Sequence, residues 1–210
     1  MTRQNRTYAR SAGIAYLVTH ITSVTAVAAY AASALPLGVA LEFTLALGCL
    51  LTGLLLLPLL RSAGEVRALT FAFLRGLEAA VIAAGTLPML ALAWTGASRD
   101  VLHALHSAAF LVGQGLVISV NTVVLAWLLL DSRLVPKALA VLGLFGGVVV
   151  LCSNTAQLFG LIPLNGPVAG ACALPIFAFE IWFAFYLIIA GLRPRADVNA
   201  GAGEHAVPAA

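Results

Sequence analysis

The sequence predicts an all-α fold, a polytopic transmembrane bundle of six helices, from three observations. First, 62% of the 210 residues are hydrophobic and only 9% are charged. A soluble domain carries about a quarter charged residues, so this chain could not cover a water-facing surface. Second, six runs are apolar for about 20 residues or more, the length that crosses the hydrocarbon of a bilayer. Third, Lys and Arg gather in alternate connections between these runs.

The six apolar runs cover residues 11–34, 41–60, 68–94, 105–130, 137–161 and 167–190. They lack the two-residue alternation of a barrel strand, and backbone in lipid must satisfy its own hydrogen bonds, so we expect each to be helical. The first run begins like a signal peptide, but it is longer than a signal core, and we expect a retained span. Residues 1–192 then form one transmembrane domain. Residues 193–210 have little apolar surface to bury, and we expect a disordered cytoplasmic tail.

The positive charges predict the orientation of the chain. Nine of the eleven Lys and Arg residues lie in the two tails and in the second and fourth connections. Arg99 alone lies in another connection, and Arg75 lies inside the third run. Because cytoplasmic loops are enriched in Lys and Arg, we expect both termini in the cytoplasm. No basic stripe with interleaved aromatic residues occurs, so nucleic acid is not an expected partner.

Several different short motifs follow one another along most of the chain, and their order is more specific than any one of them. Residues 10–17 read RSAGIAYL, residues 105–121 read LHSAAFLVGQGLVISVN, and residues 132–137 read SRLVPK. A further pattern surrounds Pro175 and Glu180 in the last run. In this order the motifs resemble the bacterial six-span integral membrane protein family catalogued as domain of unknown function 4386. The resemblance implies a multi-pass protein of the bacterial plasma (inner) membrane, and it implies no activity.

Ionisable residues inside the runs are the main signal of a site. Such a group costs about 2.5–3.5 kcal/mol on insertion scales, so it faces the bundle interior and finds partners there. Counting about 1.5 Å per residue from the run ends defines a middle layer of the membrane. This layer contains His20, Arg75, Glu78, Asn121 and Glu180.

The charges of this middle layer do not balance. Arg75 supplies one positive charge, whereas Glu78 and Glu180 would supply two negative ones. We therefore expect one carboxyl to be protonated at neutral pH, or His20 to carry the balancing proton. A bland interpretation stays open, in which Arg75, Glu78 and Glu180 form an interhelical ion-pair lock and His20 only binds a backbone carbonyl.

A second polar layer lies nearer the outer surface, and helical spacing links it to the middle layer. Its members are Glu42, His103, His106, Gln114, Asn154 and Gln157. Helical spacing places polar and small residues on one face of each of three runs, and we call each face a stripe. The stripes are His103, His106, Ser107, Gln114 and Asn121 in the fourth run; Gly143, Gly147, Asn154 and Gln157 in the fifth; and Tyr16, His20, Ser23 and Tyr30 in the first. Small residues permit close packing and amides bond across helices, so the stripes predict a polar channel from the outer surface to the middle layer.

We expect no metal and no other cofactor. His103 and His106 have the i, i+3 spacing of metal ligands, and Glu42 would complete a set of three if the second and fourth runs were adjacent. Two histidines without that third ligand are a weak site. A haem held by His20 and a second histidine would need an outer partner, because the sequence has no other histidine at mid-membrane depth. No phosphate-binding loop, HExxH or GxSxG motif occurs.

Three functions stay open from the sequence. The first is binding or transport of a small or lipophilic solute, with Glu180, Glu78 and His20 binding it or relaying a proton. The remaining ligand contacts would be Arg75, Gln114, Asn121, Asn154 and Gln157. The second is an intramembrane enzyme acting on a lipid or isoprenoid, with a protonated glutamate as general acid. The third is a structural or accessory role. Membrane lipid is the expected partner, and a homodimer would compensate for so short a chain without inverted repeats.

Overall fold

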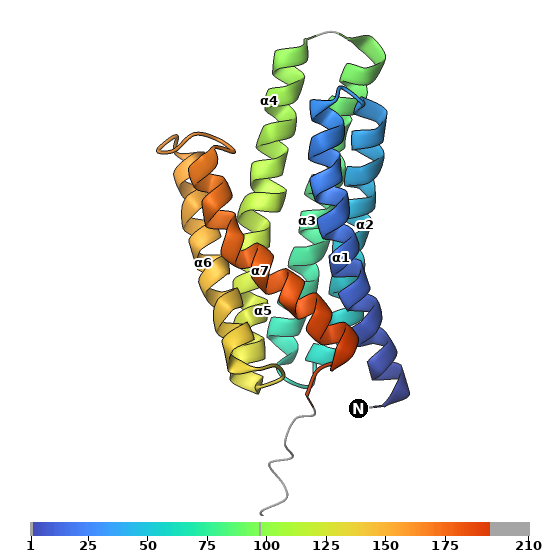
Figure 1. Cartoon of the computed structure of the whole chain (residues 1–210), viewed down its shortest axis with the longest axis vertical. Coiled ribbons are helices and arrows are strands. Elements are labelled where there is room, and N and C mark those ends of the chain that lie inside the picture. Colours follow the sequence, from blue (N-terminus) through green and yellow to red (C-terminus); the bar gives the residue numbers. More distant parts are fainter. Residues whose placement is uncertain (1, 97, 194–210) are drawn as a thin grey trace, which may run out of the picture.

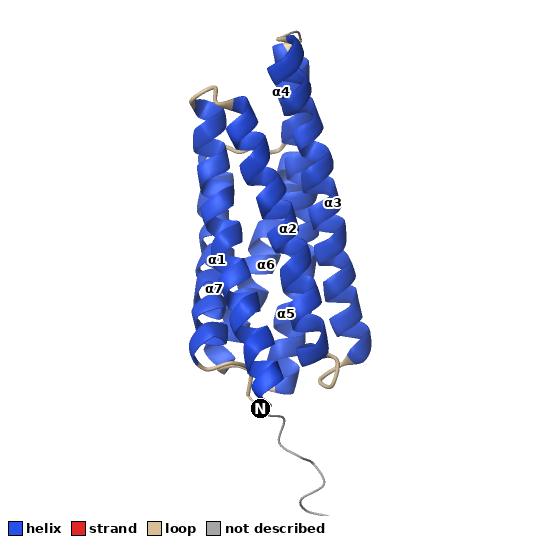
Figure 2. Ribbon diagram, turned by 90° about the vertical axis from the view of Figure 1, so that its right-hand side faces the viewer, coloured by secondary structure: helices blue, strands red, loops and turns tan. Residues whose placement is uncertain are grey.

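The computed structural model describes residues 2–96 and 98–193, and all regular elements of these ranges are helical. The helices are α1 (Arg3–Ala31), α2 (Leu35–Leu60), α3 (Glu65–Thr95), α4 (Arg99–Phe110), η1 (Leu111–Val117), α5 (Ile118–Ser132), α6 (Lys137–Leu158) and α7 (Pro167–Ile189). The π-helix η1 joins α4 to α5, so that Arg99–Ser132 runs as one helix of 34 residues. Within the described residues, six long helices therefore run along the bundle, as the sequence predicts, and Figures 1 and 2 show their arrangement.

The outer surface of the bundle is apolar. All six long helices have the length and composition to cross a membrane. Large apolar side chains face outward along them, including Ile21, Phe43, Phe145 and Ile189, which are 51–71% exposed. An apolar surface of this extent is stable in lipid and prone to association in water. The chain is accordingly a multi-pass membrane protein.

Each predicted run differs from its helix at one or both ends. The second span begins at Leu35 instead of residue 41 and the fourth at Arg99 instead of residue 105, and three other shifts have a local reason. α1 begins at Arg3 instead of residue 11, because Thr2 Oγ1 accepts a 3.2 Å hydrogen bond from Asn5 N and caps the helix. It ends at Ala31 instead of residue 34, because Ser33 takes a left-handed φ of 59°. α6 ends at Leu158 instead of residue 161, since Gly160 takes a φ of 69°.

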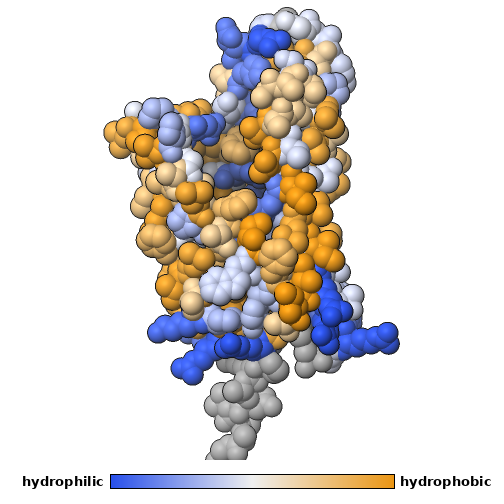
Figure 3. Space-filling model, viewed as in Figure 1, coloured by the Kyte–Doolittle hydropathy of each residue, from blue (hydrophilic) through white to orange (hydrophobic). Residues whose placement is uncertain are grey.

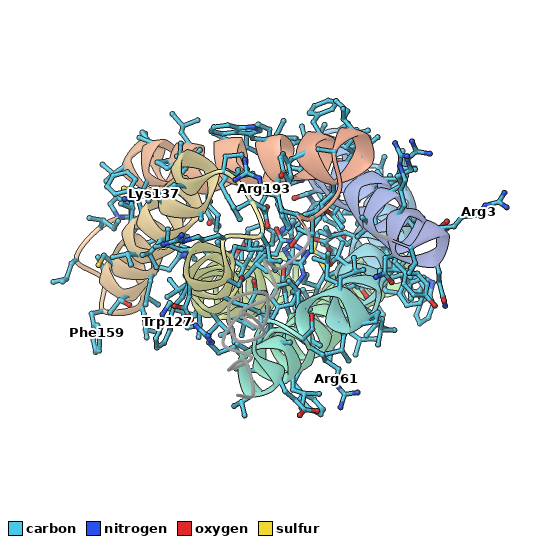
Figure 4. All side chains as sticks on the ribbon, turned by 90° about the horizontal axis from the view of Figure 1, so that it is seen from below. Arg3, Arg61, Trp127, Lys137, Phe159 and Arg193 are labelled. Carbon is cyan, nitrogen blue, oxygen red and sulfur yellow. The ribbon has the colours of Figure 1, made fainter. Side chains whose placement is uncertain are left out.

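The basic residues gather at one end of the bundle, which we call the basic end. Figure 4 shows Arg3, Arg61 and Lys137 at the rim of this end. Here Arg67 Nη2 donates to Asp131 Oδ2 at 2.7 Å, and Arg193 N donates to Leu134 O at 2.9 Å. The rest of the predicted tail, residues 194–210, lies outside the described residues. The opposite end, where α3 meets α4, is called the distal end.

The helices pack differently in the two halves. Near the basic end, one large apolar core joins α1, α2, α3, α5, α6 and α7. α7 slants across the bundle from α6 at the distal end to α1 at the basic end (Figure 1). Glycines permit this path, since a Cβ at Gly146 would lie 2.7 Å from Ile176 N, directly after Pro175 within α7. The slant leaves α7 away from α1 in the distal half.

Candidate functional site

The deepest polar group is a closed ion pair on α3. Arg75 and Glu78 are 1% and 0% exposed, and Arg75 Nη1 donates to Glu78 Oε2 at 2.9 Å. Their i, i+3 spacing places both side chains on one helix face. Arg75 Nε donates to Thr52 Oγ1 at 2.9 Å, and Arg75 lies over the Tyr16 ring at 5.2 Å from the ring centre.

The carboxylate of this pair is equally well partnered. Asn121 Nδ2 donates to Glu78 Oε2 at 2.6 Å, and Cys49 Sγ lies 3.5 Å from Glu78 Oε1. Gly53 lets α2 approach, because a Cβ there would lie 2.9 Å from Arg75 Cβ. A buried ion pair is stable only when its remaining hydrogen-bonding groups are satisfied. Arg75 and Glu78 meet that condition, and they form the floor of the site.

A second acid–base pair lies beside this floor and joins α1 to α7. His20 Nε2 lies 3.3 Å from Glu180 Oε2, and the two side chains are 13% and 9% exposed. His20 Nδ1 lies 2.8 Å from Tyr16 O. Glu180 thus faces the bundle interior, as expected of an ionisable group in a span.

The hydrogen bonds of His20 define the proton content of this pair. A carbonyl oxygen can only accept, so the contact with Tyr16 O assigns a hydrogen to Nδ1. In neutral His20 the Nε2 atom would then present a lone pair to Glu180. The 3.3 Å contact is attractive only if one further proton lies on His20 Nε2 or on Glu180. In this geometry the His20–Glu180 pair therefore holds one exchangeable proton.

A third polar cluster lies in the distal half and ties α4 to α1 and α2. Tyr30 Oη donates to Glu42 Oε2 at 2.7 Å, and His106 Nε2 lies 3.0 Å from both carboxylate oxygens of Glu42. Glu42 and His106, two of the three weak metal-site candidates, thus meet across α2 and α4. Among residues 2–96 and 98–193, no group of three His, Cys, Asp or Glu is placed to hold a metal, and His103 does not complete one with them.

A cavity of about 250 Å³ lies above the floor. The His20–Glu180 pair, Arg75, Glu78, Ser23 and Gln114 supply its polar lining. Most of the remaining wall is apolar and comes from Val24, Leu45, Phe110, Ile118, Val150, Ala173, Ile176 and Phe177. Every one of the six long helices contributes to it.

A neighbouring cavity of about 220 Å³ extends toward the distal end and shares Phe110, Gln114, Val150 and Ala173 with the first. It contains the amides Asn154 and Gln157, where Gln157 Nε2 donates to Asn154 Oδ1 at 2.8 Å. Ser153 also lines it, and its buried Oγ has no hydrogen-bond partner among the residues that the structure describes. The space-filling view shows the molecule hollowed here, between α4 and the turn that joins α6 to α7, with hydrophilic residues inside (Figure 3).

The structure divides the predicted middle layer in two. Arg75, Glu78 and Asn121 form one network, whereas Glu180 pairs with His20 and makes no ion pair with Arg75. The single lock of Arg75, Glu78 and Glu180 considered from the sequence therefore does not form. The reason is geometric, because the guanidinium is already held by Glu78, Thr52 and the Tyr16 ring.

The predicted stripe of the fourth span is interrupted. His106 contacts α2, Gln114 Oε1 lies 3.5 Å from Ser23 Oγ on α1, and Asn121 contacts α3. The π-helix η1, centred on Gln114, changes the helical phase between them. Regular α-helical spacing could not predict this, although the glycines on both sides of Gln114 are a local signal. The partners Thr52 and Cys49 were also missed, because each looks like an ordinary small residue of a span.

Comparison with known proteins gives one match. The family described as Domain of unknown function (DUF4386) matches residues 8–191. The chain therefore belongs to this family, as the resemblance of its motifs implied. No curated protein and no solved structure matches the chain.

Proposed function

We propose that this DUF4386 protein binds a small amphiphilic solute in the mid-membrane cavity, which the solute reaches from the distal half. The observation that carries the proposal is the cavity of about 250 Å³ lined by the His20–Glu180 pair. Ligand sites are mostly apolar clefts with a few convergent polar groups, and this cavity has that character. An ionisable residue inside a span marks a functional site by default.

The packing of the two halves supports access from one side. Below the cavity, Arg75, Glu78 and the ring of Tyr16 close the path to the basic end, and the large apolar core continues beneath them. Above it, the second cavity and the surface hollow lead toward the distal end (Figure 3). The geometry favours binding; transport would require the floor to open.

The proposed location is the bacterial plasma membrane, with both termini in the cytoplasm. The clustering of Lys and Arg at the basic end supports this orientation, because positive residues are retained on the cytoplasmic side. The distal mouth of the cavity then faces away from the cytoplasm. Cysteine labelling that placed Arg61 and Arg133 on opposite sides of the membrane would overturn the orientation.

Accessibility of the cavity is tested with two matched cysteine variants. In a background with Cys49, Cys152 and Cys172 replaced by Ala, Ser23→Cys lines the cavity and Ile21→Cys faces lipid two residues away. A water-soluble methanethiosulfonate reagent added to membranes should modify Ser23→Cys and leave Ile21→Cys unmodified. If neither reacts, the cavity does not admit solute from water and the proposal fails.

Binding itself is tested by mass spectrometry of small molecules retained by the purified protein. Wild-type protein and Glu65→Gln, a control at the exposed basic end, should retain the same molecule. Glu180→Gln should retain markedly less, because the carboxylate is part of the site. Equal retention by all three proteins, or none by any, would contradict the proposal.

A further inference from the structure

We propose that the cavity takes an organic cation with an apolar body, a protonated or quaternary amine, and that its binding to Glu180 releases the proton of the His20–Glu180 pair. This inference rests on the proposed function and names the class of ligand for the same site. It follows from which charges in the cavity remain free to meet a ligand, and from the chemistry of the walls.

The positive charge of the site is not available to an anion. Arg75 is 1% exposed, and its guanidinium is engaged by Glu78, Thr52 and the Tyr16 ring. An anionic ligand would meet a guanidinium whose charge Glu78 already balances, and it would bring a further negative charge beside Glu78 and Glu180. An additional buried negative charge without its own countercharge is unfavourable, so the floor disfavours anions.

The negative charge of the site is available. Glu180 lines the cavity, and its recorded side-chain partner is His20 at 3.3 Å, a longer contact than the 2.9 Å of the floor pair. A cation that approached Glu180 from the cavity would meet a carboxylate without disturbing the floor. Its charge would take the place of the proton that the pair now holds.

The walls suit the apolar part of such a cation. The centre of the Phe177 ring lies 5.0 Å from that of the His20 ring in an edge-to-face arrangement, and Phe110 also lines the cavity. Aromatic faces attract quaternary and protonated amines. The aliphatic side chains Leu45, Val150 and Ile176 complete the wall. A volume of about 250 Å³ favours a molecule built on a single ring or a short chain.

The charge balance of the exchange is simple. Before binding, the His20–Glu180 pair holds one proton between Nε2 and Oε2. On binding, the ammonium pairs with the ionised Glu180, His20 becomes neutral, and the proton leaves to water by the distal route. The other titratable and charged groups facing the pair are Tyr16, Cys49, Arg75 and Glu78, and these keep their protons and partners.

Three probes of similar size and different charge test the inference in nanodiscs by calorimetry. They are benzyltrimethylammonium, the neutral benzyl alcohol and the anionic benzenesulfonate. We expect the cation to bind and the other two to bind at least tenfold more weakly. Titrations in two buffers of different ionisation enthalpy should show one proton released per cation bound. Because binding releases a proton, the dissociation constant for the cation should fall about tenfold for each unit by which the pH is raised, as long as the free pair is protonated.

Variants distinguish a role of the Glu180 carboxylate in cation binding from a role in folding. Glu180→Gln should lose cation binding and proton release, Glu180→Asp should retain part of both, and Glu65→Gln should behave as wild type. If Glu180→Gln does not fold, proton release by the wild type still decides the question. Cation binding without proton release, or stronger binding of benzyl alcohol or benzenesulfonate, would overturn the inference and leave the proposed function standing. If Ser23→Cys is labelled but the cation does not bind, the inference fails and the proposed function stands. If Ser23→Cys is not labelled, both the inference and the proposed function fail.

Discussion

The two halves of the bundle solve the problem of burying polar groups in opposite ways. Near the basic end, helices pack on a continuous apolar core, and the one ion pair at its upper edge has all its partners. In the distal half, the buried apolar cluster is small, comprising Leu45, Ala46, Cys49, Ala79 and Ile82, and cavities separate the helices. None of the residues of α4 is buried.

This contrast indicates that the half near the basic end mainly provides stability and the distal half mainly provides the binding site. Sites that bind ligands are drawn from regions of few buried contacts, because such regions can open at low free energy. The closed half holds the six helices together, so the open half is free to keep polar side chains without full packing. Breaking contacts in each half should therefore have different consequences.

The largest effect should come from the ion pair at the boundary of the halves. Arg75→Ala leaves Glu78 buried beside Asn121 without its countercharge, and we expect a loss of about 3–5 kcal/mol in the free energy of unfolding. Reversible unfolding in mixed micelles, followed by circular dichroism, measures it. Arg61→Ala removes the exposed ion pair with Glu65 and is the control, expected to cost at most about 1 kcal/mol. Equal losses would show that the boundary pair contributes no special stability.

Glycines sharpen the comparison of packing. In Gly13→Ala the added Cβ would lie 2.6 Å from Ala184 O between α1 and α7, and we expect a loss of about 1–3 kcal/mol. Gly170→Ala on the distal part of α7 meets no atom within 4 Å, so it should leave stability unchanged or raise it by less than about 1 kcal/mol. Melting temperatures of both variants in the same detergent test the difference. A larger loss from Gly170→Ala would mean that the distal half is closed.

The distal cluster should affect local opening more than global stability. Glu42→Gln weakens the contacts to Tyr30 and His106, and interhelical hydrogen bonds in membranes average about 0.6 kcal/mol. We expect hydrogen exchange to increase within Arg99–Phe110 and to stay unchanged within Lys137–Leu158. Uniform exchange along both helices would contradict a separate attachment of α4.

The smallest effect should come from the pair between α3 and α5 at the membrane surface. Arg67 contacts Asp131, whose side chain is 60% exposed, and lies over the Trp127 ring at 5.3 Å from its centre. Arg67→Ala should lower stability by about 0.5 kcal/mol or less, and the loss should shrink at high salt. Unfolding at two salt concentrations measures it, and a loss that salt leaves unchanged would assign the contribution to packing on Trp127.

Sequence patterns could predict the fold because lipid imposes simple rules. Apolar length sets the number of spans, and positive charge sets the predicted orientation, so both follow without any tertiary contact. The same logic placed His20, Glu78 and Glu180 inside the bundle, where the structure has them. Pairing could not be predicted, because it depends on the helix neighbours. His20 meets Glu180 only because α7 slants onto α1, and no spacing in the sequence encodes that slant.

The π-helix η1 has a mechanical consequence for the fourth span. A π-helical turn contains one more residue than an α-helical turn, and such turns often lie at functional sites. Converting η1 to α-helix would rotate α4 about its own axis by about 100° per residue of register. His106 would then leave Glu42, and Gln114 would leave the cavity wall. A change of one residue in the register of Leu111–Val117 would therefore move Gln114 in the cavity wall and α4 at the cavity mouth together.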